Sequence, residues 1–176
     1  MAMHATIPKT ALYPGRFQPL HNGHANVIRC LAAKYHRVIV TISMSHLSHL
    51  PENPLSGGER YEMITRFVKS ERIGNVEVIP VPYDSLLSTW VAFIKSICPP
   101  FDIVYARNPL IRTIFKDYGY AIEEHQFERR ISGTAVRAAI SKSAEWESML
   151  PPSVVLFLKE RQLHQRIAEV SIDKNV

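Results

Sequence analysis

The stretch GRFQPLHNGH, residues 15–24, follows the short apolar segment TALYP (10–14) and precedes a run with helical spacing. It holds two glycines, one proline, one arginine and two histidines three positions apart. The apolar residues Val27, Ile28 and Leu31 that come after it recur at helical intervals. A strand therefore leads into a helix here, and the stretch forms the turn between them.

The same alternation of apolar runs and helical patterns continues along the chain. Strands are expected at 9–14, 37–43, 75–82, 101–106 and 120–125, and helices at 22–35, 58–71, 88–97, 109–119, 132–141 and 151–167. The strands are continuous apolar runs, which is typical of a parallel sheet covered on both faces. The sequence therefore predicts an α/β fold, a Rossmann-like doubly wound parallel sheet of about five strands with C-terminal helices. No repeat or linker interrupts it, so a single domain over residues 1–176 is expected.

Composition limits the partners. No apolar run reaches the roughly 18 residues of a membrane span, and MAMHATIPKT lacks the apolar region of a signal peptide. We therefore expect a cytoplasmic protein with no membrane partner. The net charge of +5 includes no block of five basic residues, so no nucleic-acid partner is expected. A site for a phosphorylated metabolite needs only a few arginines and histidines.

The turn carries the residue types of an anion site. His21 and His24 fall on one side of the first helical turn, where free backbone N–H groups and the helix dipole favour negative charge. Gly23 between them lets a nucleotide approach closely, Gly15 permits the tight turn, and Arg16 can hold a phosphate with its bidentate fork. The alternative for either histidine alone is a surface residue that caps the helix.

A second candidate phosphate site is ISGTAVR, residues 131–137. Ser132 or Thr134 can cap a new helix, and the hydroxyls and N-terminal amides there favour phosphate. Arg137 lies within the first turns of that helix. The alternative is an ordinary capped helix with a solvated arginine.

Together, the two segments resemble a known family. GRFQPLHNGH resembles the HxGH motif of the nucleotidyltransferase superfamily, and ISGTAVR resembles its ISxTxxR motif. More narrowly, the chain is similar to the archaeal-type nicotinamide mononucleotide (NMN) adenylyltransferases. That similarity also rests on SHLPENPLSGGERYEMI (48–64), STWVAFI (88–94), PPFDIVYARNPLIRTIFKDYGY (99–120) and WESMLPPSVVLFLKE (146–160).

The resemblance implies a reaction and its participants. The partners would be ATP and NMN, with NAD and pyrophosphate as products of in-line attack by the NMN phosphate on the α-phosphorus of ATP. Mg²⁺ would accompany ATP and bridge its phosphate oxygens, with few direct protein ligands. Because enzymes of this type are often oligomeric, the resemblance also implies a homo-oligomer.

The resemblance implies roles for the two phosphate segments. His21 and His24 would contact the ATP phosphates and stabilise the transition state. Arg16 would hold these phosphates or the incoming NMN phosphate. Ser132 and Arg137 would bind the β- and γ-phosphates.

Other positions complete the candidate site. By resemblance, Gly15 and Phe17 shape the backbone around the nucleotide, His49 contacts it, and Trp90 stacks on the cationic nicotinamide ring. The alternative for Trp90 is a core tryptophan. Asn108 is a candidate for substrate contact because it follows a strand whose end lines the cleft.

Some positions depart from the family pattern. Leu87 and Leu50 stand where asparagine and threonine are common, and the acidic residue Asp84 is displaced. Because leucine cannot replace an amide hydrogen bond, another phosphorylated acceptor (nicotinic acid mononucleotide, phosphopantetheine or a flavin precursor) is an alternative to NMN. A nucleotide-sensing module without turnover is a separate alternative, of a different functional class. His46 and His49 form an HxxH pair, but no further ligands follow at useful spacing, so no protein-held metal is predicted.

Overall fold

The computed structural model describes residues 9–82, 87–123 and 131–172. Its centre is a five-stranded sheet of β1 (Thr10–Gly15), β2 (Arg37–Ile42), β3 (Val76–Pro80), β4 (Ile103–Tyr105) and β5 (Ala121–Glu123). All strand pairs are parallel, and the strand order is β3-β2-β1-β4-β5. The direction of winding reverses between β1 and β4, which makes their carboxyl ends the expected ligand site. The predicted doubly wound sheet is confirmed.

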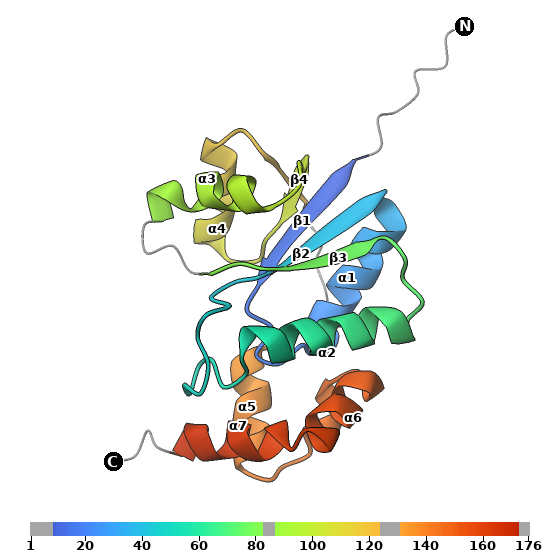
Figure 1. Ribbon diagram of the computed structural model, residues 1–176, viewed down its shortest axis with the longest axis vertical. Helices are drawn as coiled ribbons and strands as arrows, with labels where there is room; N and C mark the ends of the chain where they lie inside the picture. Colours follow the sequence, from blue (N-terminus) through green and yellow to red (C-terminus); the bar gives the residue numbers. More distant parts are fainter. Residues whose placement is uncertain (1–8, 83–86, 124–130, 173–176) are drawn as a thin grey trace, which may run out of the picture.

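Helices cover both faces of this sheet. Figure 1 shows α1 (Asn22–Lys34) and α2 (Gly57–Ser70) on one side, and α3 (Leu87–Ile97) and α4 (Pro109–Asp117) on the other. The chain closes with α5 (Gly133–Ser141), a 3₁₀ turn η1 (Glu147–Met149), α6 (Pro152–Glu160) and α7 (Leu163–Ile172), which pack beyond α2. None of the described helices has the length and apolarity needed to cross a membrane.

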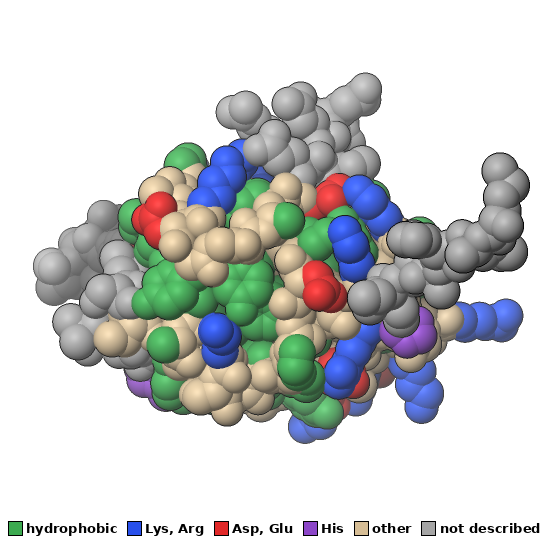
Figure 2. All heavy atoms as spheres, turned by 90° about the horizontal axis from the view of Figure 1, so that it is seen from above, with side chains coloured by type: hydrophobic (Ala, Val, Ile, Leu, Met, Phe, Trp, Pro, Cys, Tyr) green, Lys and Arg blue, Asp and Glu red, His purple; other side chains and the backbone are tan. Residues whose placement is uncertain are grey.

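The strands are apolar on both faces because each face has its own core. Along β1, Ala11 and Tyr13 pack with α1, α2 and the C-terminal helices, whereas Leu12 between them packs with α3 and α4. Since successive strand side chains point to opposite faces, a strand buried on both sides contains consecutive apolar residues. Seen from the α3–α4 end, Figure 2 shows hydrophobic side chains also gathered on the surface.

The single helix predicted over 151–167 is wrong, because α6 and α7 are separate helices. The break falls at Arg161 and Gln162, and Gln162 adopts a positive φ of 53°. The turn lets Leu163 and Ile167 pack into the same core as α6. No glycine or proline marks this break, so the sequence carried no local signal for it.

Candidate active site

Two histidines cap the first helix with each other. The Nδ1 atom of His21 accepts from the backbone N–H of His24, and the Nδ1 atom of His24 accepts from the backbone N–H of His21, both at 3.3 Å. Their rings stack with centroids 3.7 Å apart. Because each Nδ1 is an acceptor, each neutral imidazole carries its proton on Nε2. Both histidines therefore cap the helix, but His21 is buried and is not the surface residue that the alternative assumed. The caps leave two Nε2–H donors for a ligand.

Both histidines are neutral at physiological pH. Burial lowers the pKa of His21 to about 4, and the positive charge of Arg107 acts in the same direction. Burial also holds the pKa of His24 well below its ordinary value, with further contributions from His21 and Arg107. Neutral donors at a helix N-terminus can stabilise negative charge without bringing a full positive charge of their own.

The depressed pKa of His21 makes stability depend on pH. Between pH 6.5 and about 4 the unfolded chain binds a proton at His21 that the folded chain does not, so the free energy of unfolding falls as pH falls. From pH 7.5 to pH 5 this loss is about 2 kcal/mol. His21→Asn keeps an N-cap acceptor and removes the titration. Urea unfolding at both pH values should show a smaller loss for His21→Asn than for the wild type, and equal losses would contradict the assignment.

The second motif lies against the first. Ser132 caps α5 by accepting from the backbone N–H of Ala135 at 3.1 Å. Arg137 is buried, and its Nη1 donates to the carbonyl of Gln18 at 2.9 Å. A Cβ on Gly133 would lie 3.1 Å from that same carbonyl oxygen. The structure thus brings the start of α5 to the turn that contains the histidines.

Arg137 is buried and contacts Thr134, so its surroundings differ from those of a solvated arginine. The reading of Arg137 as a solvated arginine is wrong, since only 7% of the residue is exposed. Its Nη2 donates to the Oγ1 of Thr134 at 3.4 Å. Burial lowers the pKa of Arg137, and the charge of Arg16 adds to that effect. Arg16 itself is exposed and lines the pocket described below, whereas Arg137 does not.

Around the histidines, Gly15, Phe17 and Gly23 act through close packing. The ring of Phe17 lies 4.8 Å from that of His24, centroid to centroid, and a Cβ on Gly15 would lie 2.8 Å from the Phe17 ring. A Cβ on Gly23 would lie 3.0 Å from the His21 ring. Each glycine therefore leaves room for a ring that sets the position of the histidine pair.

Arg60 was not predicted as a site residue, yet it organises the loops. Its guanidinium is fully buried and donates to five backbone carbonyls at 2.8–3.3 Å. They belong to Arg16, Ser43, Met44, Leu47 and Ser56. Burial lowers the pKa of Arg60 to about 10, with Arg16 adding to the effect. The signal was the helical position of Arg60 on the same face as the buried Ile64 and Phe67.

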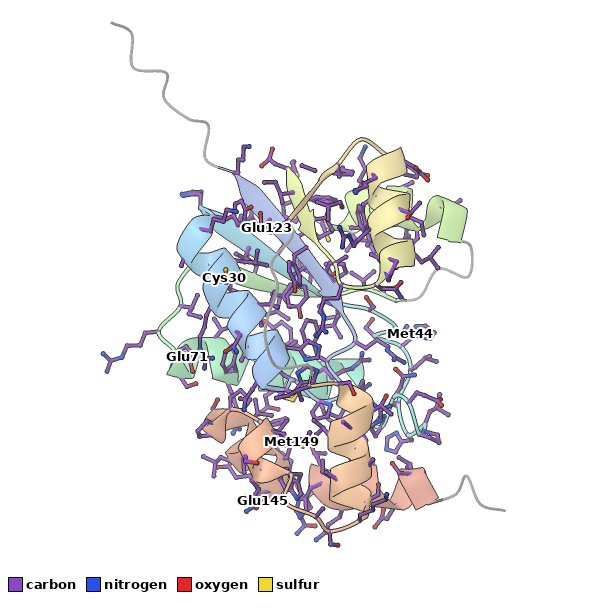
Figure 3. All side chains as sticks on the ribbon, turned by 180° about the vertical axis from the view of Figure 1, so that it is seen from behind. Cys30, Met44, Glu71, Glu123, Glu145 and Met149 are labelled. Carbon is purple, nitrogen blue, oxygen red and sulfur yellow. The ribbon has the colours of Figure 1, made fainter. Side chains whose placement is uncertain are left out.

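A pocket of about 320 Å³ opens at the carboxyl ends of β1, β2 and β4. Its lining residues are Pro14, Gly15, Arg16, Ser43, Met44, Trp90, Ala106, Arg107, Asn108 and Ile111. Gly15, Arg16, Trp90 and Asn108 were predicted, whereas Ser43, Met44 and Arg107 were not. Figure 3 shows Met44 on the segment between the α3–α4 layer and the C-terminal helices. The pocket therefore lies where the strand order reverses.

Trp90 and Asn108 both have structural roles as well. Trp90 is only 8% exposed and packs edge-on against Phe115 with centroids 5.5 Å apart, so it is a core tryptophan whose remaining surface lines the pocket. Asn108 caps α4, its Oδ1 accepting from the backbone N–H of Leu110 at 2.9 Å. Leu87 begins α3, but its side chain, like Asp84, lies outside the described residues.

His49 lies in the loop before α2 and is not among the residues that line this pocket. Its Nε2 contacts Nη1 of Arg166 in α7 at 3.1 Å, and its Nδ1 contacts Oγ of Ser48 at 3.0 Å. Arg166 also pairs with Glu59, whose carboxylate accepts from the backbone N–H of Ser56 at the start of α2. Within the described residues, no group of three or more His, Cys, Asp or Glu could hold a metal ion.

Comparison with known proteins agrees with this geometry. A family model described as cytidylyltransferase-like matches residues 12–139. A nicotinamide-nucleotide adenylyltransferase of Ignicoccus hospitalis is 36% identical over 166 residues, which cover 92% of this chain and 97% of that protein. One from Methanocorpusculum labreanum is 38% identical over 165 residues, which cover 93% and 98%.

A solved structure supports the fold. It is a bifunctional NMN adenylyltransferase/ADP ribose pyrophosphatase from Francisella tularensis, complexed with AMP and a manganese ion, and it superposes with a TM-score of 0.73 at 16% identity. The match covers 93% of this chain and 52% of that one, so this chain spans about half its length. The motifs, the fold and the whole-length relatives agree. The chain belongs to the cytidylyltransferase-like family, in the branch of the archaeal nicotinamide-nucleotide adenylyltransferases.

Proposed function

We propose that this protein transfers the adenylyl group of ATP to NMN, forming NAD and pyrophosphate. The observation that carries the proposal is the stacked, neutral pair His21 and His24 at the N-terminus of α1, with the start of α5 beside it. The relatives that share almost the whole chain are named nicotinamide-nucleotide adenylyltransferases. A site that only sensed nucleotides would not need donors placed for charge that develops during a reaction.

The chain's own groups position and stabilise; none has to act as a nucleophile. The phosphate oxygen of NMN forms a bond to the α-phosphorus of ATP while the bond to the pyrophosphate oxygen breaks in line. The Nε2–H groups of His21 and His24 donate to phosphate oxygens as negative charge grows on the leaving group. Arg16, Ser132, Thr134 and the first amides of α5 hold the β- and γ-phosphates.

Arg137 is buried and supports the phosphate-binding groups indirectly. Its bonds to the Gln18 carbonyl and to Thr134 hold the start of α5 against the turn that carries the histidines. Its charge favours phosphate at that junction. His49 contributes less directly, because its ring contacts Arg166 and Ser48 and fixes the loop before α2.

Mg²⁺ is proposed to arrive with ATP. We propose no direct protein ligand for it, because Mg²⁺ in such sites would keep several waters and bind substrate phosphates. When bound, the ion neutralises charge on the phosphates. A cytoplasmic location, a single domain and homo-oligomerisation stay predictions.

The acceptor is tested with a panel. Purified protein, ATP and Mg²⁺ are combined with NMN, nicotinic acid mononucleotide, phosphopantetheine or riboflavin phosphate, and pyrophosphate release is measured. Release with NMN at least as efficient as with any other acceptor supports the proposal. Release only with phosphopantetheine or riboflavin phosphate would overturn the pyridine acceptor. Binding of ATP without release from any acceptor would favour a sensor.

Trp90 is expected to bind the nicotinamide ring. Trp90→Phe keeps an aromatic side chain in the core but offers a weaker face to a cationic ring, so the KM for NMN should rise about threefold to tenfold while the KM for ATP changes little. Steady-state kinetics with each substrate varied in turn measures this. The matched control is Trp146→Phe, which alters a buried tryptophan that stacks on His164 instead. Equal increases in both KM values would rule out stacking.

A further inference from the structure

Arg107 lies at the end of β4, beside the end of β1 that carries Arg16. Strands β1 and β4 are parallel neighbours, with Leu12 opposite Val104. Both arginines are exposed, and both line the 320 Å³ pocket. Because parallel neighbours end at the same edge of a sheet, the two guanidinium groups approach the pocket from adjacent strand ends.

Arg107 also acts on the histidine pair. Its positive charge contributes to lowering the pKa of both His21 and His24, and it acts on Tyr13, which packs next to His24. Arg107 is thus a pocket residue whose charge reaches the proposed reaction centre. Trp90, in contrast, belongs to the α3–α4 core and presents an apolar, aromatic wall.

The side chains that line this pocket carry a net positive charge. Among the described residues, the lining includes two arginines and no aspartate or glutamate. The rest of the lining is largely apolar, with Met44, Trp90 and Ile111. Such a pocket fits a molecule that has an aromatic ring at one end and an anionic group at the other.

We propose that Arg107, beside Arg16, binds the phosphate of the acceptor mononucleotide and so holds the attacking oxygen near the histidine pair. The inference rests on the proposed function and assigns a further substrate-binding residue. With the ring against Trp90, the acceptor's phosphate must extend toward His21 and His24, and Arg107 is the lining residue whose charge acts on both. A guanidinium can bind two phosphate oxygens at once and fix the direction of the third.

The test compares Arg107→Gln with Lys116→Gln, which removes the same charge from an exposed position on α4 outside the pocket. Calorimetry measures the binding of NMN, of nicotinamide riboside, which lacks the phosphate, and of ATP. For Arg107→Gln we expect the Kd of NMN to rise about tenfold to a hundredfold, and that of nicotinamide riboside and ATP to change less than about threefold. Arg107→Lys should be intermediate, since a lysine is a point charge without the bidentate fork.

Other results would overturn the inference. If NMN binding is unchanged in Arg107→Gln, the residue does not touch the acceptor. If nicotinamide riboside weakens as much as NMN, Arg107 contacts the ring end. If ATP weakens most, the phosphate it binds is that of ATP. A wild-type protein that makes no NAD would refute the proposed function, whereas an active wild type with an unaffected Arg107→Gln would refute this inference alone.

Discussion

Replacing His24 with alanine is expected to lower kcat about 10²–10³-fold while changing the Kd of ATP less than about tenfold. The Nε2–H of His24 acts mainly on charge that develops in the transition state, so its removal affects rate more than ground-state binding. ATP keeps the helix N-termini and the arginines in the variant. Rapid-quench kinetics for kcat and calorimetry for ATP binding measure the two quantities separately.

The same substitution has a structural side that the experiment must control. His24 accepts the backbone N–H of His21 and packs against Phe17, so some stability is lost with it. The matched control is His36→Ala, which removes an exposed histidine between α1 and β2. Both variants should remain folded by circular dichroism at the assay temperature. A loss of ATP affinity as large as the loss of rate would contradict the transition-state role.

Replacing Arg60 with methionine is expected to lower the free energy of unfolding by about 3–5 kcal/mol. The substitution removes the guanidinium donors of five carbonyls. The carbonyls of Ser56 and Met44 keep a backbone donor, whereas those of Arg16, Ser43 and Leu47 lose a buried donor. The five carbonyls include those of Arg16, Ser43 and Met44, which line the pocket. The remaining folded protein should therefore also bind NMN less well.

Urea unfolding with Arg66→Met as the matched control separates this role from ordinary surface charge. Arg66 lies on the same helix and pairs with Glu62 and Glu160, but its side chain is 40% exposed. Exposed pairs of this kind contribute little to the free energy of unfolding, because water and salt screen them. If Arg60→Met and Arg66→Met destabilise the protein equally, the five-carbonyl arrangement is not the stabilising feature.

Local patterns in the sequence were enough to predict the histidine turn. The spacing of His21 and His24, the apolar strand before them and the helical run after them all lie within about 20 residues. The order of strands and helices also followed from local periodicity. The parallel pairing was predicted because strands buried on both faces are apolar throughout.

Contacts between distant residues could not be predicted in this way. Arg60 bonds carbonyls as far away in sequence as that of Arg16, and His49 contacts Arg166, 117 residues later. Arg107 was not predicted as a site residue, because its place beside Arg16 depends on the pairing of β4 with β1. The break at Gln162 depends on packing of α7 and not on a glycine or proline. In each case a tertiary contact sets the role, and a single sequence does not contain it.

The most direct test of the central claim is a ³¹P NMR time course of wild-type protein with ATP, NMN and Mg²⁺. In-line transfer to the NMN phosphate predicts that the signals of the NAD diphosphate and of pyrophosphate grow together in a 1:1 ratio as ATP and NMN disappear. Formation of ADP and orthophosphate, or of AMP and pyrophosphate without NAD, would show that the site cleaves ATP without joining it to NMN and would contradict the account.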